Sequence, residues 1–277
     1  MKENVYRLYP APTEEVPLTG LYLDHDLRGH RKVSDSPFVY TNYITSLDGR
    51  IAIPHPTRPG LMVPKATANP RDWRLFQELA VQADVLITSG RYLRDYADGR
   101  AQEILQVYDD PRFADLKEWR IERGLSPQPD WALISGSLDF AIPEALTKRG
   151  RSLLIFTTSR ADPERIKALE KQAGKVIVAG DEGVEGNQLI DNLAELGYRV
   201  VYNTTGPKVL HLLLKAGALN RLYLTYANRI LGGKPFASIV DGELFEPAID
   251  FQLSALYHDP YALEGNGQLM TAYDRVS

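Results

Sequence analysis

The stretch that most constrains the fold runs from Tyr198 to Leu214 and reads YRVVYNTTGPKVLHLLL. Its first five residues alternate β-branched and aromatic side chains, which predicts a short buried strand, and the apolar residues that follow recur at helical spacing. Gly206 allows another group to approach the backbone, Pro207 suits the first turn of a helix, and Gly217 is placed to end it. A strand that passes directly into a helix leaves free amides at the positive end of the helix dipole, which predicts an anion site. The alternative is an ordinary turn whose threonines only cap the helix.

The same alternation of strand and helix recurs along most of the chain. Expected strands cover residues 38–45, 85–88, 131–135, 153–157, 176–179, 198–202 and 221–226, and expected helices cover 69–80, 111–123, 143–149, 162–172, 188–196 and 207–216. Repeated strand–helix–strand units predict an α/β fold with a largely parallel sheet that helices cover on both faces. Near the C-terminus, Asn266-Gly267 lies between two strand-like runs and predicts an antiparallel hairpin at one edge of the sheet. Residues 1–36 are rich in proline and charge and are expected to form an N-terminal arm, with residues 37–277 as one domain.

Composition excludes several classes of function. The chain has 277 residues, 44% of them hydrophobic, and a net charge of −4 with its basic residues dispersed, which argues against a nucleic-acid surface. It has no cysteine, which excludes disulfides, thiolate catalysis and cysteine-ligated metals, and its five histidines lack the spacing of metal ligands. No apolar run approaches about 18 residues, and the polar N-terminus lacks a secretion signal. We therefore expect a cytoplasmic protein with no membrane partner and no metal.

Polar clusters follow three of the expected strands, at the ends where ligands of parallel sheets bind. The hydroxyls, glycines and arginines of these clusters favour a phosphate-rich ligand, and three such positions suggest a dinucleotide. An arginine just after a strand is the residue that takes an adenosine 2′-phosphate, so Arg160 favours NADPH over NADH; the alternative is a solvated charge at a helix start. The candidate cofactor-binding residues are Ser89, Gly90, Arg91 and Tyr92, then Thr157, Thr158, Ser159 and Arg160, and finally Thr204, Thr205, Gly206 and Pro207.

Five segments together carry a family resemblance. YTNYITSLDGRIA, ADVLITSGRYLRD, LLIFTTSRAD, YRVVYNTTGP and LTYANRILGGKPF resemble, in order and spacing, the dihydrofolate-reductase-like family, specifically the pyrimidine reductase domain of riboflavin biosynthesis, over about residues 37–242. The resemblance implies a three-layer fold, NADPH bound across the sheet, a ribosylamino-pyrimidine phosphate as the family's substrate, and a homodimer. We therefore expect an NADPH-dependent reductase of a small heterocyclic substrate, which is a pyrimidine, a pterin or a related compound. It implies contacts of Gly90 and Arg91 with the cofactor phosphates, of residues 157–160 with the adenosine side, and of residues 204–207 with the pyrophosphate.

The Ser46-Leu47-Asp48-Gly49 turn is the most specific part of the resemblance. Because it falls in the family's substrate region, Ser46 and Asp48 are the catalytic candidates, whose task would be to orient the acceptor and help to deliver a proton while NADPH brings the hydride. The alternative for Asp48 is a turn residue before a glycine.

The sequence also departs from the family pattern. Thr204-Thr205-Gly206 replaces the usual Glu-Gly-Gly, Gly90-Arg91-Tyr92-Leu93 replaces Gly-x-Gly-Thr, and the Asp-x-Pro segment that holds the ribose phosphate has no clear match. The zinc deaminase domain often fused to this reductase is also missing, since it needs cysteines. Two other functions therefore stay open: a nucleotide-binding or regulatory protein that has lost catalysis, and a sugar-nucleotide or phosphate-transfer enzyme.

Overall fold

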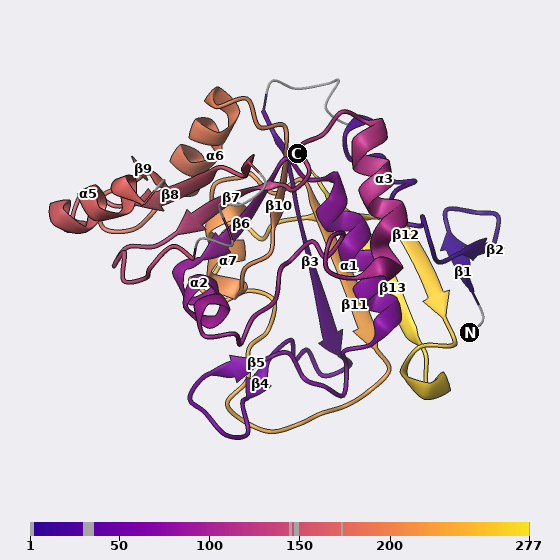
Figure 1. Ribbon diagram of the computed structural model, residues 1–277. Helices are drawn as coiled ribbons and strands as arrows, with labels where there is room; N and C mark the ends of the chain where they lie inside the picture. The colour runs from indigo at the N-terminus through magenta and orange to yellow at the C-terminus, as the bar shows by residue number, and fades with distance from the viewer. Residues whose placement is uncertain (1–2, 30–35, 144–145, 147–149, 173, 277) are drawn as a thin grey trace. The chain divides into compact units, whose positions relative to one another are not determined.

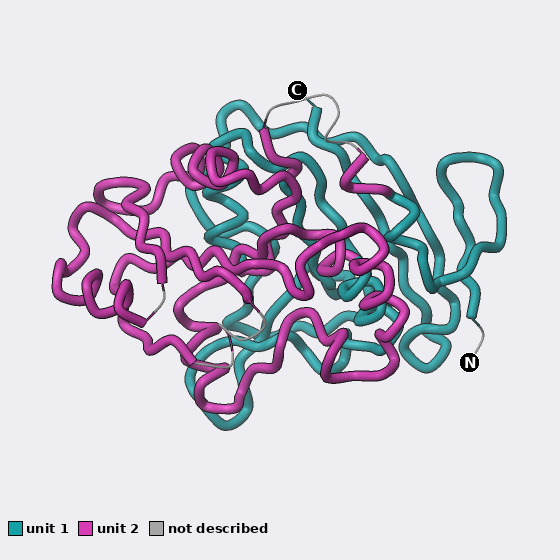
Figure 2. The backbone as a smooth tube through the Cα atoms, turned by 45° about the horizontal axis from the view of Figure 1, so that its top comes forward, with its two compact units in different colours: residues 1–25, 39–78, 206–277 teal, residues 26–38, 79–205 magenta. Residues whose placement is uncertain are grey.

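A computed structural model describes residues 3–29, 36–143, 146, 150–172 and 174–276 (Figure 1). The chain forms two compact units. Unit 1 comprises residues 1–25, 39–78 and 206–277, and unit 2 comprises residues 26–38 and 79–205 (Figure 2). Each unit draws its residues from distant parts of the sequence, so neither corresponds to a continuous segment of the chain.

Unit 1 contains the mixed part of the sheet. Its strands lie in the order β2 (Glu14–Pro17), β1 (Asn4–Tyr9), β12 (Phe251–Asp259), β13 (Gln268–Arg275), β11 (Arg221–Ala227) and β3 (Phe38–Ser46, in this unit from residue 39). β11 runs parallel to β3, and the other neighbours pair antiparallel. All but one of the β11 residues are buried, which explains the nearly continuous apolar run in that segment.

The C-terminal hairpin is confirmed, as β12 and β13 joined through a short 3-10 turn, η4 (Leu263–Gly265). Its predicted position at the edge is wrong, because β1 pairs with β12, for example through Tyr6 and His258, and β2 lies outside β1. Residues 4–17, expected within an irregular arm, therefore form two strands. The sequence did not indicate these strands, because the segment is rich in proline and charge. Val5 is the only buried residue of β1. The domain boundary at residue 36 stays a prediction.

Unit 2 contains a purely parallel set of strands. Their order is β10 (Val200–Asn203), β6 (Val85–Ser89), β7 (Asp130–Ile134), β8 (Leu153–Thr157) and β9 (Gly174–Val178). The helices of this unit are α2 (Gly90–Ala97), α3 (Ala114–Glu122) after the turn η2 (Pro111–Phe113), α5 (Pro163–Lys171) and α6 (Gly186–Glu195). These elements confirm the predicted alternation, and all five residues of β8 are buried. The helix expected at 143–149 falls mostly outside the described residues.

The two remaining helices lie within two residues of their predicted bounds. α1 (Pro70–Gln82) starts in unit 1 and ends in unit 2, and the Asn69 side chain caps it by accepting hydrogen bonds from the amides of Arg71 and Asp72. α7 (Pro207–Lys215) is followed by Gly217 at φ +68°, the left-handed conformation expected at a helix end. Two short strands, β4 (Ile53–Pro54) and β5 (Leu61–Met62), pair within the proline-rich loop. None of the described helices has the length and apolarity that a bilayer crossing needs.

Candidate functional site

The carboxyl ends of four parallel strands meet at one edge of unit 2. The register pairs Asn203 of β10 with Ile87 of β6, Ser89 with Ile134 of β7, and Ile134 with Phe156 of β8. The three predicted polar clusters therefore follow strands that end at the same edge, as the sequence analysis expected. Crevices at such edges are the usual ligand sites of parallel sheets.

The first cluster is less open than the sequence suggested, because Gly90, Arg91 and Tyr92 form the first turn of α2 and not a loop. Gly90 is buried, and a Cβ atom at that position would lie 2.9 Å from the Phe140 ring. The Tyr92 hydroxyl donates to the Gln102 carbonyl oxygen at 2.5 Å, and burial raises its pKa well above the ordinary value. Tyr92 therefore packs within unit 2, while the Arg91 side chain is 59% exposed.

The second cluster begins with a buried hydroxyl that lacks a partner. Thr157 ends β8 with no exposed surface, and its Oγ1 atom has no hydrogen-bond partner among the described residues. Thr158 is also buried, whereas Ser159 is exposed and donates from its hydroxyl to the Asp181 carboxylate. A buried polar group without a partner costs stability, so Thr157 Oγ1 is suited to a ligand that completes its hydrogen bonding.

Arg160 follows this cluster and is held by two carboxylates. Its Nη2 atom lies 2.8 Å from Glu182 Oε1 and 3.4 Å from Asp181 Oδ2, and its side chain is 61% exposed. Neither Asp181 nor Glu182 is among the site residues that the sequence predicted. The signal that would have found them is their position just after β9, the strand that pairs with β8.

The third cluster is the turn between β10 and α7. Thr204 donates from its amide and its hydroxyl to the Ile87 carbonyl oxygen, at 3.1 and 2.9 Å. Thr205 donates from its amide and its hydroxyl to Asn203 Oδ1, at 3.2 and 2.6 Å. Since Gly206 is the N-cap residue, no side chain caps α7 from that position. Gly206 is exposed with φ −83°, and among the described residues no atom beyond its chain neighbours lies within 4 Å of the place where its Cβ would be. A ligand therefore has unobstructed access to the start of α7, although the backbone is not left-handed there.

The predicted catalytic pair lies in unit 1, at the end of β3. Asp48 accepts hydrogen bonds from the Ser46 hydroxyl at 2.5 Å and from the amides of Gly232 at 2.8 Å and Leu231 at 3.3 Å, and it pairs with Arg50 at 2.8 Å. The Ser46 hydroxyl bond and the backbone bonds lower the pKa of Asp48 to about 2. Asp48 is therefore an anion at neutral pH whose contacts support the turn role, and Ser46 is buried beside it.

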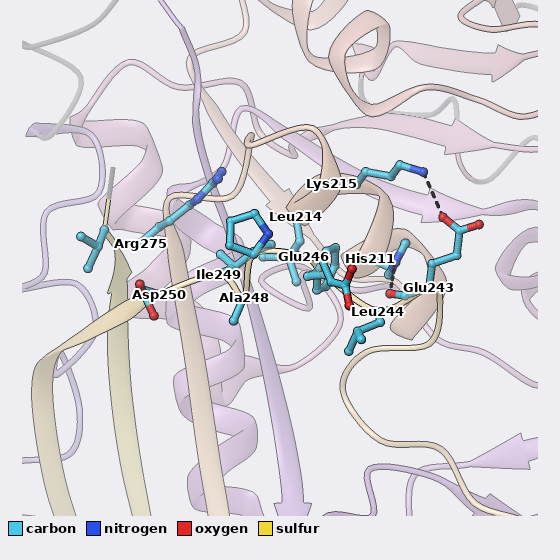
Figure 3. Close-up of a pocket in the computed structure, with 13 residues that line it drawn as sticks. His211, Leu214, Lys215, Glu243, Leu244, Glu246, Ala248, Ile249, Asp250 and Arg275 are labelled. Carbon is cyan, nitrogen blue, oxygen red and sulfur yellow. Dashed lines mark hydrogen bonds and ion pairs between the residues drawn. The ribbon is translucent and has the colours of Figure 1, made fainter.

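A separate cavity of about 550 Å³ lies in unit 1 beside the C-terminal half of α7 (Figure 3). His211 stacks on Phe245 with ring centroids 4.7 Å apart, and Glu243 contacts both the His211 ring through its carbonyl oxygen at 2.9 Å and the Lys215 ammonium through its carboxylate at 3.3 Å. His211 is thus packed against Phe245 and hydrogen-bonded to Glu243. Because no predicted site residue lines this cavity, it is not the candidate cofactor site.

The donor chemistry of these clusters fits a phosphorylated nucleotide. In unit 2 the unpartnered Thr157 hydroxyl and the Arg160 guanidinium follow β8. In unit 1 the exposed Gly206 precedes a helix of nine residues, whose first turn favours anions. The described part of the chain holds no cluster of three or more histidine and carboxylate side chains suited to a metal ion.

Comparison with known proteins identifies relatives of this chain. The family model described as the RibD C-terminal domain matches residues 37–260. The 2,5-diamino-6-ribosylamino-4(3H)-pyrimidinone 5′-phosphate reductase of Archaeoglobus fulgidus is 24% identical over 214 residues, which are 76% of this chain and 88% of that protein. The reductase of the same name from Methanothermobacter thermautotrophicus is 23% identical over 214 residues, with 77% and 88% covered.

Two solved structures show the fold. A pyrimidine reductase-like protein from Corynebacterium diphtheriae superimposes with a TM-score of 0.65 at 22% identity, covering 87% of this chain and 92% of the other. The riboflavin biosynthesis reductase of Saccharomyces cerevisiae gives a TM-score of 0.60 at 15% identity, covering 93% and 99%. These similarities confirm the α/β fold that the sequence predicted.

Proposed function

Because the chain belongs to the RibD C-terminal domain family, we propose that it is an oxidoreductase that reduces a ribosylaminopyrimidine phosphate of riboflavin biosynthesis with NADPH. The observation that carries the proposal is the family match over residues 37–260, together with curated relatives that this chain matches over 88% of their length. The proposal includes a homodimer, as the family resemblance implies, and a cytoplasmic location, as expected from the sequence.

The nicotinamide supplies the hydride when the cofactor is bound, and the chain supplies binding and orientation. We assign Thr157, Thr158, Ser159 and Arg160 to the adenosine end. Thr157 would complete its hydrogen bonding there, and the Arg160 guanidinium would take the extra phosphate. We assign Thr204, Thr205, Gly206 and Pro207 to the pyrophosphate, because the start of α7 is unobstructed at Gly206. Ser89, Gly90, Arg91 and Tyr92 complete the proposed set at the end of β6.

Ser46 and Asp48 are proposed to act on the substrate side by holding the turn in place. Asp48 is ionised near neutral pH, so it has no proton to donate. Its bonds to Leu231 and Gly232 fix one loop of unit 1 against the turn that follows β3. A rigid turn beside the substrate would keep the hydride acceptor correctly placed. This matters because misplacement of the acceptor by about 1 Å can lower the reaction rate by on the order of a hundredfold.

The test uses the full chain with NADPH and the pyrimidine phosphate that the archaeal relatives' name specifies. NADPH binding is titrated by protein fluorescence, and turnover is followed as loss of nicotinamide absorbance. We expect saturable binding and substrate-dependent oxidation. Stoichiometric binding without oxidation would favour the non-catalytic alternative, and tighter binding of a nucleotide diphosphate-sugar than of NADPH would overturn the cofactor assignment.

A further inference from the structure

The ends of β8 and β9 carry two kinds of nucleotide-reading residue side by side. In dinucleotide folds an arginine after a strand takes the 2′-phosphate of NADPH, whereas an aspartate or glutamate accepts a hydrogen bond from the ribose 2′-hydroxyl of NADH. Arg160 follows β8, and Asp181 and Glu182 follow β9, the paired neighbour of β8. All three side chains are joined, with Arg160 Nη2 at 2.8 Å from Glu182 and 3.4 Å from Asp181.

The net negative charge of this cluster disfavours the binding of an anionic ligand group. One guanidinium and two carboxylates give a formal charge of −1, and the guanidinium is already bonded to both acids. A 2′-phosphate, which carries close to two negative charges, must take Arg160 away from these acids and approach them at short range. A ribose hydroxyl meets no such competition, because it is neutral and can donate to a carboxylate.

The two acids differ in how firmly they are held. Asp181 accepts a hydrogen bond from the Ser159 hydroxyl, and the Ser159 amide donates to the Gly180 carbonyl oxygen at 2.9 Å, so Asp181 is fixed from two sides. Glu182 is 79% exposed and, among the described residues, contacts Arg160 alone. Glu182 is therefore the acid that a phosphate displaces.

We propose that Glu182 competes with the cofactor's 2′-phosphate for Arg160 and thereby determines how strongly this chain prefers NADPH to NADH. This inference rests on the proposed function. In this proposal Arg160 touches the 2′-phosphate, and Glu182 acts through Arg160 as a positioning residue. The preference of the native chain for NADPH over NADH is correspondingly small, because the 2′-phosphate must first break the ion pair between Arg160 and Glu182.

The experiment compares Glu182→Gln with the native chain in fluorescence titrations of NADPH and NADH, and of adenosine 2′,5′-bisphosphate and AMP as fragments of the adenosine end. An exposed ion pair contributes at most about 1 kcal/mol, so we expect Glu182→Gln to tighten NADPH and the bisphosphate by about two- to fivefold. NADH and AMP should bind as before. Glu164→Gln is the matched control, because it removes an exposed carboxylate of α5 whose partner is Lys167, and it should leave the NADPH-to-NADH ratio unchanged.

A double-mutant comparison separates competition from simple charge repulsion. If Glu182 acts through Arg160, its replacement should give a smaller gain in an Arg160→Ala background. A gain of the same size in that background would overturn the inference, as would an unchanged ratio in Glu182→Gln while both dinucleotides bind. If the native chain binds neither dinucleotide, the proposed function itself falls, which is a distinct result.

Discussion

The Asp48 carboxylate accepts a hydrogen bond from the backbone amide of Gly232 at 2.8 Å, and this bond joins the turn after β3 to the loop after β11. Arg50 strengthens the same junction, since it pairs with Asp48 at 2.8 Å and donates to the Gly233 carbonyl oxygen at 3.0 Å. The guanidinium also lies over the Phe236 ring, 4.3 Å from its centroid. The most specific motif of the sequence is thus a junction between two loops of unit 1.

Replacing Asp48 with Asn should destabilise the protein at neutral pH, because the amide keeps the shape but loses the ion pair and the charge-assisted bonds. The folded-state pKa of about 2 lies below the ordinary value of 3.8, so this stabilisation is present above about pH 4 and is lost as the pH falls through 2. Melting temperatures of the two proteins should therefore converge between pH 4 and pH 2. Asp191→Asn on the exposed face of α6 is the control, and a constant difference down to pH 2 would contradict this assignment.

Asp72 shows the opposite pH dependence. Burial raises its pKa to about 6, against a lowering effect of its hydrogen bond with Thr225. Because the folded-state pKa is above the unfolded one, stability is complete below about pH 4 and falls as the pH rises through 6. We expect Asp72→Asn to remove this slope and to stabilise the protein at pH 7 by up to about 3 kcal/mol. The free energy of unfolding of both proteins, measured with denaturant between pH 4 and pH 7, tests this prediction. Parallel plots of that free energy against pH would refute the assignment.

The sequence predicted those elements whose signals are local. β8 has the predicted bounds because five apolar or β-branched residues lie between polar breaks, and α1 begins after the capping residue Asn69. The strand β1 was not predictable in this way, because its place depends on pairing with β12 at the opposite end of the chain. No local pattern in residues 4–9 encodes that partner.

The same distinction applies to the candidate site. The polar clusters were found because each follows a strand, but their side-chain partners were not. The pairing of Arg160 with Glu182 and the bond of Asp48 to Gly232 join residues that become neighbours only when separate strands end at the same edge. Gly206 is open for a ligand, as expected. Its φ of −83° is not left-handed, so the backbone conformation at this position does not require glycine.

Arg160→Ala should weaken NADPH binding by about tenfold, the lower end of what a charge-assisted contact contributes, because Asp181 and Glu182 already compete for the guanidinium. NADH affinity should not change, since NADH lacks the extra phosphate. Arg165→Ala, which removes a half-exposed arginine of α5, is the control. Dissociation constants from titration of both dinucleotides give the ratio, and a ratio that survives Arg160→Ala would remove this residue from the adenosine end.

Gly206→Val tests the start of α7. The residue is exposed, its backbone angles suit any side chain, and in the described part of the chain no atom beyond its two neighbours lies within 4 Å of the added Cβ. The variant should therefore fold with a stability within about 0.5 kcal/mol of the native chain. The added methyl groups would occupy the space in front of the first turn of α7, where the proposed pyrophosphate would bind, so NADPH binding should be lost. Gly206→Ala provides a smaller step in the same series and should weaken binding without abolishing it. Melting temperature and NADPH titration are measured on the same preparations, and native affinity in a folded Gly206→Val protein would show that the pyrophosphate binds elsewhere.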